Sequence, residues 1–410
     1  MKTVSVPWGV WYRERTIELD FPDRWDVHVA KTQTEETLDA RAMARHLASP
    51  IGTPLLRELA RERHNAVIAI DDITRPTPTA TLLPLVLREL EKGRLPLERA
   101  TVIVASGAHR PAVLTDLDRK LGHRLARSLE VHVHNPYEGL IHLGRTHTGV
   151  PIDINSVFMN GDLKIAIGGI TPHESVGFGG GRKTVAIGLA GLETIQAFHA
   201  RDDQVRTGQI AGNAQHSTLV EIARRAGLEF IVNAVFTMNR GVGGLVAGHP
   251  VLAHEAGMAI ARRAYRTAVP ASADVVVLNA YPKDTDLLQS CMALNVAWLP
   301  CPAIVRPGGS IIITTACPEG AGLHFLVGDG MRSPLAWSEE LLDGYHVGIV
   351  SPNLSPHDVY RHFPRAVALY AGWPDALAAL IKQHGEIARA VVYPCAALQL
   401  TEAQRCIGVS

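Results

Sequence analysis

Lys183 and His199 lie close to a run of glycines near the middle of the chain, and His173 precedes that run. An imidazole can bind a metal or move a proton, and an amine can attack an electrophilic carbon. Glycine has no Cβ, so the backbone across 177–181 can approach a bound group closely. Reactive side chains therefore flank a backbone that suits a cofactor.

The same residues also have structural explanations. Lys183 could be a solvent-facing lysine, and His199 a half-buried residue on a helix predicted over 191–200. The loop partly matches the phosphate-binding pattern G-x-x-x-x-G-K-[ST], but Arg182 occupies the second required glycine. No acidic strand that could bind magnesium follows the loop. The pattern argues against a nucleoside triphosphatase, although backbone contact with a phosphate stays open.

A polar motif follows the apolar run 66–70, which reads as a buried strand. It contains Asp72, Thr74 and Arg75. A guanidinium in such a loop can hold a carboxylate or phosphate through two parallel hydrogen bonds. The alternative is a capped turn in which Arg75 pairs with an aspartate.

His109 follows a second predicted strand at 101–105, and a third is predicted at 163–167. A histidine in a strand-end loop can act as a general acid or base, although with 19 histidines in the chain a structural role is the alternative. The carboxyl ends of parallel strands share one sheet edge, where ligands bind in open α/β sheets. Four other histidines are interpreted as structural: His132, His134, His142 and His147.

Short β-branched runs alternate with helical stretches along the chain, which predicts an α/β fold with mostly parallel sheets and helices on both faces. Further strands are predicted at 274–278, 310–315 and 346–350. We expect two domains. Residues 1–269 would form the first and 270–395 a smaller second one, with a tail of about 396–410 returning to the first.

Composition excludes several classes of protein. The chain has 410 residues, 47% of them hydrophobic and 20% charged, with a net charge of +0. This balance predicts no nucleic-acid partner, and no apolar run approaches the roughly 20 residues of a membrane span. The amino terminus lacks the apolar core of a secretion signal. Five cysteines, odd in number and widely spaced, favour reduced thiols, so we expect a cytoplasmic protein with no membrane partner.

Taken in order, the motifs resemble one family. Asp-Asp-x-Thr-Arg-Pro-x-Pro at 71–78 is followed by Gly-x-His-Arg at 107–110, then by a histidine, glycine loop and lysine at 173–183, and then by the helical histidine. This ordered set resembles the nickel-dependent lactate racemase family, and the likeness extends past residue 320. Later residues that agree are Tyr281, Pro282, Asp286, Gln289 and the run Cys317–Gly320.

The resemblance implies a nickel pincer nucleotide (pyridinium-3-thioamide-5-thiocarboxylic acid mononucleotide), made by cofactor-maturation proteins and held in an interdomain cleft. Lys183 would hold it covalently, and His199 would bind nickel. His109 and His173 would be the two acid/base groups, and Arg75 would bind substrate. The other implied contacts are Asp72, Thr74, Gly179, Gly180 and Gly181 to the cofactor, and Gln289 and Lys283 to the substrate.

These parts suit inversion at C2 of a 2-hydroxy acid. Plain deprotonation would place a carbanion beside a carboxylate. Hydride transfer avoids this carbanion, because the acid is first oxidised to the 2-keto acid and then reduced from the other face. An enzyme that handles both antipodes needs two bases, and a well-placed base contributes about 10²–10⁴-fold in rate. The cofactor would carry the redox step, and the protein would orient the substrate.

The sequence departs from the family at two positions. Lactate racemase has a tyrosine directly before the glutamine and a lysine three residues after it, where this chain has Leu288 and Met292. A cationic contact to the substrate carboxylate is lost unless Lys283 or Arg75 replaces it. We therefore expect a substrate larger than lactate, such as a sugar acid (an aldonate).

Two other functions stay open. One is a zinc-dependent hydrolase or lyase in which His109, His173 and His199 bind the metal around an activated water. The other is a non-catalytic carrier of the nickel nucleotide. A carrier needs no paired bases, so the presence of His109 together with His173 favours catalysis.

Overall fold

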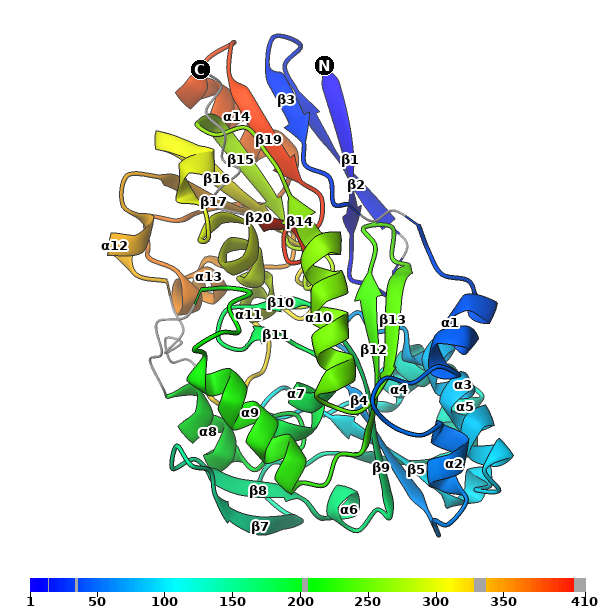
Figure 1. Ribbon diagram of the computed structural model, residues 1–410. Helices are drawn as coiled ribbons and strands as arrows, with labels where there is room; N and C mark the ends of the chain where they lie inside the picture. Colours follow the sequence, from blue (N-terminus) through cyan, green and yellow to red (C-terminus); the bar gives the residue numbers. More distant parts are fainter. Residues whose placement is uncertain (14, 34–35, 201–205, 328–336, 402–410) are drawn as a thin grey trace. The chain divides into compact units, whose positions relative to one another are not determined.

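The computed structural model describes residues 1–13, 15–33, 36–200, 206–327 and 337–401. The chain divides into two compact units, one made of Met1–Gln33 with Tyr265–Ser410 and the other of Thr34–Ala264. Each unit is built on a six-stranded, mostly parallel sheet with helices (Figure 1). The predicted α/β class is therefore confirmed.

The sheet of the Thr34–Ala264 unit has the three predicted strands at its centre. Its neighbours are parallel except for the pair β12–β13. Every residue of β4 is buried, as expected for an apolar run covered on both faces. In sheet order the strands are β13 (Val242–Gly248), β12 (Phe230–Phe236), β9 (Leu163–Gly169), β4 (Ala66–Asp71), β5 (Ala100–Ala105) and β6 (Glu130–Val133).

Helices cover both faces of this sheet. Figure 1 shows α8 and α9 on one side and α2, α3 and α5 on the other. The helices of this unit are α1 (Ala40–Leu47), α2 (Leu56–Ala60), α3 (Thr79–Lys92), α4 (Leu114–Leu121), α5 (Leu125–Ser128), α6 (Ser156–Met159), α7 (Gly181–Ala186), α8 (Leu192–His199), α9 (Ala214–Arg225) and α10 (Leu252–Tyr265). Two small hairpins complete it: β7 (Leu140–Arg145) with β8 (Pro151–Asn155), and β10 (Pro172–His173) with β11 (Gly177–Phe178).

The other unit has an all-parallel sheet with a core on each face. Alternate residues of β15 serve the two cores: Val275 and Val277 join the cluster of Trp25, and Val276 and Leu278 join that of Trp298. In sheet order the strands are β18 (Ala368–Tyr370), β17 (His346–Val350), β16 (Val305–Thr314), β15 (Ala273–Asn279), β19 (Arg389–Tyr393) and β3 (Asp26–Val29). Its other elements are β1 (Lys2–Trp8), β2 (Arg15–Phe21), β14 (Arg266–Thr267), β20 (Leu400–Thr401), α11 (Leu287–Ser290), α12 (Glu339–Leu342), α13 (Pro356–His362) and α14 (Trp373–His384).

The predicted domain of residues 1–269 is wrong for the first 33 residues. Strand β3 pairs in parallel with β19, and this pairing attaches the amino-terminal segment to the unit that follows residue 264. The pairing joins strands more than 350 residues apart, which no local pattern predicts. Of the predicted returning tail, β20 pairs with β14 inside this same unit, and residues 402–410 lie outside the described residues.

Two sequence expectations concern the environment of the protein. Cys291, Cys317 and Cys395 are buried free thiols, whereas Cys301 is disulfide-bonded, which the cysteine pattern did not predict. In the described part of the chain, no helix has both the length and the hydropathy that a membrane span requires.

Candidate active site

The predicted reactive side chains of the Thr34–Ala264 unit gather at one edge of its sheet. Strands β9, β4 and β5 are adjacent and parallel, so the loops that follow them leave the sheet side by side. The β4 loop carries Asp72 and Arg75, and the β5 loop carries His109. The β9 loop leads to His173 and the glycine loop.

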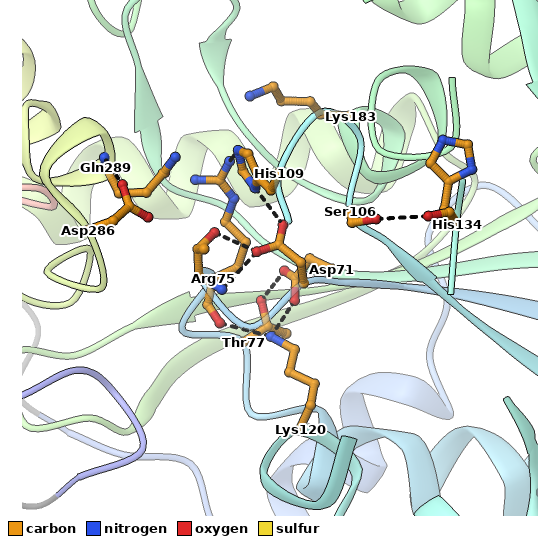
Figure 2. Close-up of polar contacts among 12 residues, drawn as sticks. Asp71, Arg75, Thr77, Ser106, His109, Lys120, His134, Lys183, Asp286 and Gln289 are labelled. Carbon is orange, nitrogen blue, oxygen red and sulfur yellow. Dashed lines mark hydrogen bonds and ion pairs between the residues drawn. The ribbon is translucent and has the colours of Figure 1, made fainter. Parts of the chain in front are cut away.

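The β4 and β5 loops meet in a hydrogen-bonded network (Figure 2). His109 Nδ1 lies 3.0 Å from Asp72 Oδ2, and Arg75 Nη2 lies 3.4 Å from His109 Nε2. Thr74 donates its backbone N–H (2.7 Å) and its hydroxyl (2.5 Å) to Asp72 Oδ1. Because an ionised carboxylate only accepts, His109 donates from Nδ1, and its Nε2 is the basic nitrogen.

Burial and charge act in opposite directions on this pair. Burial alone would raise the pKa of Asp72, but His109, Arg75 and Thr74 together lower it well below its ordinary value. Burial lowers the pKa of His109, and the neighbouring Asp72 opposes that effect. The arrangement holds a neutral imidazole in one tautomer, which is what a general base requires.

Lys120 holds the loop after β4 in place, and the sequence did not indicate this role. Its Nζ lies 2.6 Å from Asp71 Oδ1 and donates to the carbonyl of Arg75 at 2.8 Å. Thr77 donates its hydroxyl to Asp71 Oδ2 at 2.5 Å (Figure 2). Lys120 is only 2% exposed. It lies on α4, whose many charges suggest an exposed helix, and the apolar Leu114 of that helix is itself 58% exposed, so the local pattern gave no signal for its burial.

The glycine loop connects β10 to α7. Gly177 begins β11 opposite His173 and has a φ of 76°, a conformation that favours glycine. Lys183, in the first turn of α7, places its Nζ 2.6 Å from His173 Nε2. Burial, with a smaller effect of Arg75, lowers the pKa of Lys183 to about 7. Much of this amine is therefore neutral, and hence nucleophilic, near physiological pH.

The tautomer of His173 agrees with a neutral amine. The backbone N–H of Ser175 donates to His173 Nδ1 at 3.3 Å. A neutral imidazole that accepts at Nδ1 carries its proton on Nε2, so it donates that proton to the lone pair of Lys183. His173 is buried, with 8% of its surface exposed.

His199 ends α8, as the predicted helix required. Its Nδ1 lies 2.7 Å from the carbonyl of Ile195, which can only accept, so Nε2 is the unprotonated nitrogen. Burial lowers the pKa of His199, with smaller effects from Lys183 and His109. A neutral imidazole whose other nitrogen is held by a carbonyl is the usual form of a histidine metal ligand.

The described residues contain no group of three or more His, Cys, Asp and Glu side chains arranged to hold a metal ion. This finding gives no support to a zinc site made by His109, His173 and His199. The histidines interpreted as structural have ordinary partners: His134 lies 2.9 Å from the carbonyl of Ala190, while His132, His142 and His147 pair with surface carboxylates.

The predicted substrate contacts Lys283 and Gln289 belong to the other unit and are both buried. Asp284 beside them accepts from the backbone N–H groups of Gly9 and Val10, each at 3.1 Å. Asp286 caps α11 through the N–H of Gln289 at 2.8 Å. Two buried carboxylates between Lys283 and Gln289 thus fix the backbone of the segment that carries them.

The chain is similar over most of its length to characterised racemases. The family of the lactate racemase N-terminal domain matches residues 12–208. The lactate racemase of Lactiplantibacillus plantarum is 31% identical over 356 residues, 84% of this chain and 81% of that protein. The lactate racemase of Thermoanaerobacterium thermosaccharolyticum is 30% identical over 78% of this chain and 76% of its own length.

The chain belongs to the lactate racemase family. It is therefore an isomerase, and the predicted family is confirmed. The solved structure of the lactate racemase apoprotein from T. thermosaccharolyticum superposes with a TM-score of 0.77 at 25% identity, covering 98% of this chain and all of that one. A Thermotoga maritima protein shares the fold, with a TM-score of 0.61 and 17% identity over 83% of this chain and 98% of its own.

Proposed function

We propose that this racemase inverts C2 of a 2-hydroxy acid larger than lactate, with a nickel pincer nucleotide attached to Lys183. The buried, largely neutral amine of Lys183, 2.6 Å from an imidazole, is the observation that carries this proposal. An ordinary surface lysine is charged and solvated, whereas this one can attack a carbonyl-like carbon. We further propose that maturation proteins supply the nucleotide and that the enzyme works in the cytoplasm.

The residues at the site fit such a group. Lys183 offers a nucleophile, and His199 offers one unprotonated imidazole nitrogen, a donor that suits nickel. At Gly179 an added Cβ would meet no protein atom closer than 3.6 Å, so protein packing does not explain the glycine, whereas a group bound against the backbone would. At Gly180 the backbone itself requires glycine, since φ is 139°.

When bound, the nucleotide would supply a hydride acceptor for the substrate carbon. The protein then has to bind the carboxylate and move protons. Arg75 offers a guanidinium beside His109, so a substrate carboxylate on Arg75 would bring its hydroxyl near the basic Nε2. Asp72 holds the other nitrogen of His109. His173 would serve the second antipode, because racemisation needs a base for each.

Substrate size is proposed from two positions on and after α11. Met292 is buried against Val296 and Ala397, so it fills protein space that a lysine would leave to reach solvent or substrate. Leu288 carries no charge and cannot replace the cation. Arg75 and Lys283 remain as carboxylate partners. A longer acid, such as an aldonate, would make additional contacts that compensate for the lost cation.

The test is intact-protein mass spectrometry after co-expression with the proteins that make the cofactor. We expect a covalent mass increase on the wild-type chain, none on Lys183→Ala, and nickel in proportion to the adduct. The loaded enzyme should exchange stereochemistry at C2 of aldonates faster than that of lactate. A loaded wild-type chain without nickel would contradict the proposal.

Two variants separate catalysis from cofactor storage. His109→Ala and His173→Ala should each abolish exchange while leaving nickel content largely intact, because neither is proposed to bind the metal. Loaded wild-type protein that exchanges no 2-hydroxy acid would instead indicate a carrier. Normal turnover in either variant would overturn the two-base assignment.

A further inference from the structure

A buried arginine lies behind the glycine loop, on the residue adjacent to Lys183. Arg182 is 1% exposed, and its Nη2 lies 2.6 Å from His254 Nδ1 and 3.4 Å from His216 Nε2. Burial lowers the pKa of Arg182 to about 10, against the raising effect of Glu255. Two imidazoles thus accept hydrogen bonds from this guanidinium, which is an unusual environment for a buried cation.

The guanidinium fixes the state of both histidines. Because arginine can only donate, His254 accepts at Nδ1 and His216 accepts at Nε2. Each ring then carries its proton on the other nitrogen. His254 donates from Nε2 to the carbonyl of Gly179 at 2.7 Å, and His216 donates from Nδ1 to the carbonyl of Val176 at 3.1 Å. One cation thus directs two neutral imidazoles onto two carbonyls of the glycine loop.

Other contacts fasten the same loop. Asn213 donates to the carbonyl of Ser175 at 2.9 Å, and Asn233 accepts from the N–H of Gly181 at 2.9 Å. The guanidinium of Arg262 lies 5.4 Å from the centre of the Phe178 ring. A Cβ at Gly180 would lie 2.6 Å from His254 Nε2, so the loop and the histidine are fitted to each other.

We propose that Arg182, His216 and His254 form a positioning relay that holds the glycine loop, and through it the amine of Lys183, in its buried place beside His173. His216 and His254 hydrogen-bond to the loop and Arg182 orients both rings, so all three are positioning residues. The relay rests on the proposed function, because only that function gives the Lys183 amine a use. The hydrogen bonds that hold the loop are independent of the proposed function.

The experiment measures the pKa of Lys183 in the apoprotein by competitive labelling of amines across pH, read by mass spectrometry. The charged and titratable groups that act on that amine are Arg75, Glu174, Asp72, His173, His109 and His199, and none of them is substituted in the variants. In the wild type we expect a value near 7. In Arg182→Met it should rise toward the usual lysine value of 10.5, because the amine moves to solvent. Arg182→Lys, which keeps one donor for both imidazoles, should rise less.

A matched pair of variants tests the hydrogen bond from His254 to the carbonyl of Gly179. In His254→Gln the amide nitrogen can still donate to the carbonyl of Gly179, whereas in His254→Asn the side chain can accept from Arg182 but does not reach that carbonyl. The asparagine variant should therefore raise the Lys183 pKa more than the glutamine variant. His142→Asn, at an exposed histidine of the same unit, is the control and should change nothing.

Lys183 titrating near 7 in folded Arg182→Met and His254→Asn would overturn the relay. If Arg182→Met does not fold, the His254 pair and His216→Ala decide the question, since each removes one contact and leaves the cation in place. The two proposals also fail separately. A wild-type chain that never carries an adduct defeats the proposed function, while an unmoved Lys183 pKa in the variants defeats the relay alone.

Discussion

The two loops that build the candidate site are held by opposite kinds of chemistry. The loop after β4 is held by charges: Lys120 on Asp71, and Asp72 on His109. The glycine loop is held by neutral imidazoles, which a buried arginine orients onto its carbonyls. One loop depends on carboxylates staying ionised, and the other depends on histidines staying uncharged.

The difference follows from what each loop is proposed to do. Arg75 would bind an anionic substrate, and the neighbouring carboxylates of Asp71 and Asp72 are held by Lys120 and His109. Lys183 would act as a neutral amine, and a carboxylate behind its loop would favour the ammonium form. Imidazoles fasten the backbone without adding negative charge. The two halves of the site should therefore respond differently to mutation and to acid.

The largest effect on the reaction rate is expected in the loop after β4, which is held by charges. In Asp72→Asn the amide can donate to His109 Nδ1, which moves the imidazole proton onto Nε2 and removes the base. The rate of stereochemical exchange per bound nickel should fall about 10²–10⁴-fold. Asp153→Asn, which alters a surface His–Asp pair in the same unit, is the control and should keep full activity. A loss smaller than about tenfold in Asp72→Asn would contradict the role of His109.

The Lys120–Asp71 pair should show the next largest effect, on stability. In Lys120→Met the Asp71 carboxylate is left buried without its cation, which should lower the free energy of unfolding by about 3–5 kcal/mol near pH 7. Burial already raises the pKa of Asp71, so part of the loss should return as the pH falls through that pKa and the carboxyl becomes neutral. Urea denaturation at pH 7 and pH 5 measures both.

Two controls define this prediction. The double variant Asp71→Asn with Lys120→Met removes both charges and should recover much of the stability. Lys92→Met removes an exposed cation from Glu89, 2.6 Å away, and should cost far less because Glu89 keeps Arg57 as a second partner. If Lys120→Met and Lys92→Met destabilised the protein equally, burial of the pair would have no energetic consequence.

The sequence predicted the strands and reactive residues of the site better than the residues that hold its loops in place. Apolar runs identified β4, β5 and β9, and their polar ends located Arg75 and His109, because both signals are local. The relay partners His216 and His254 come from helices far along the chain, and their meaning depends on tautomers that only three-dimensional contacts fix. For the same reason the pairing of β3 with β19 escaped prediction.

The two loops should lose stability at different pH values. Burial and Arg182 lower the pKa values of His216 and His254, so the stability these histidines contribute is present above the ordinary value of 6.5 and is lost as the pH falls below it. Protonated His254 would face the Arg182 cation, whereas protonated His109 would keep its contact with Asp72. The pKa of Asp72 is lowered, so its contribution is lost only below about 3.8.

Hydrogen exchange of the two loops measures this difference. After correction for intrinsic rates, peptides covering 174–183 should lose protection between pH 6.5 and 5, while the protection that Asp72 gives to 71–77 should persist until the pH falls below about 4. The contact of Lys120 with Asp71 should weaken before that, because burial raises the pKa of Asp71. Glu255 also faces Arg182 and His216, so Glu255→Gln serves to test its share of the shift. Simultaneous loss of protection in both loops would show that the charged and neutral supports do not differ.

The smallest effect is expected where the same pair of residue types lies at the surface. His142 Nδ1 lies 2.8 Å from Asp153 Oδ1, closer than His109 lies to Asp72, but the His142 side chain is 61% exposed. Water and salt screen such a pair, so His142→Gln should change the free energy of unfolding by about 0.5 kcal/mol or less. A loss above about 1 kcal/mol, measured by urea denaturation, would mean that distance and not burial decides what a His–Asp pair contributes here. In that case burial would not distinguish the Asp72–His109 pair from a surface pair, and only the effect of Asp72 on the reaction rate would.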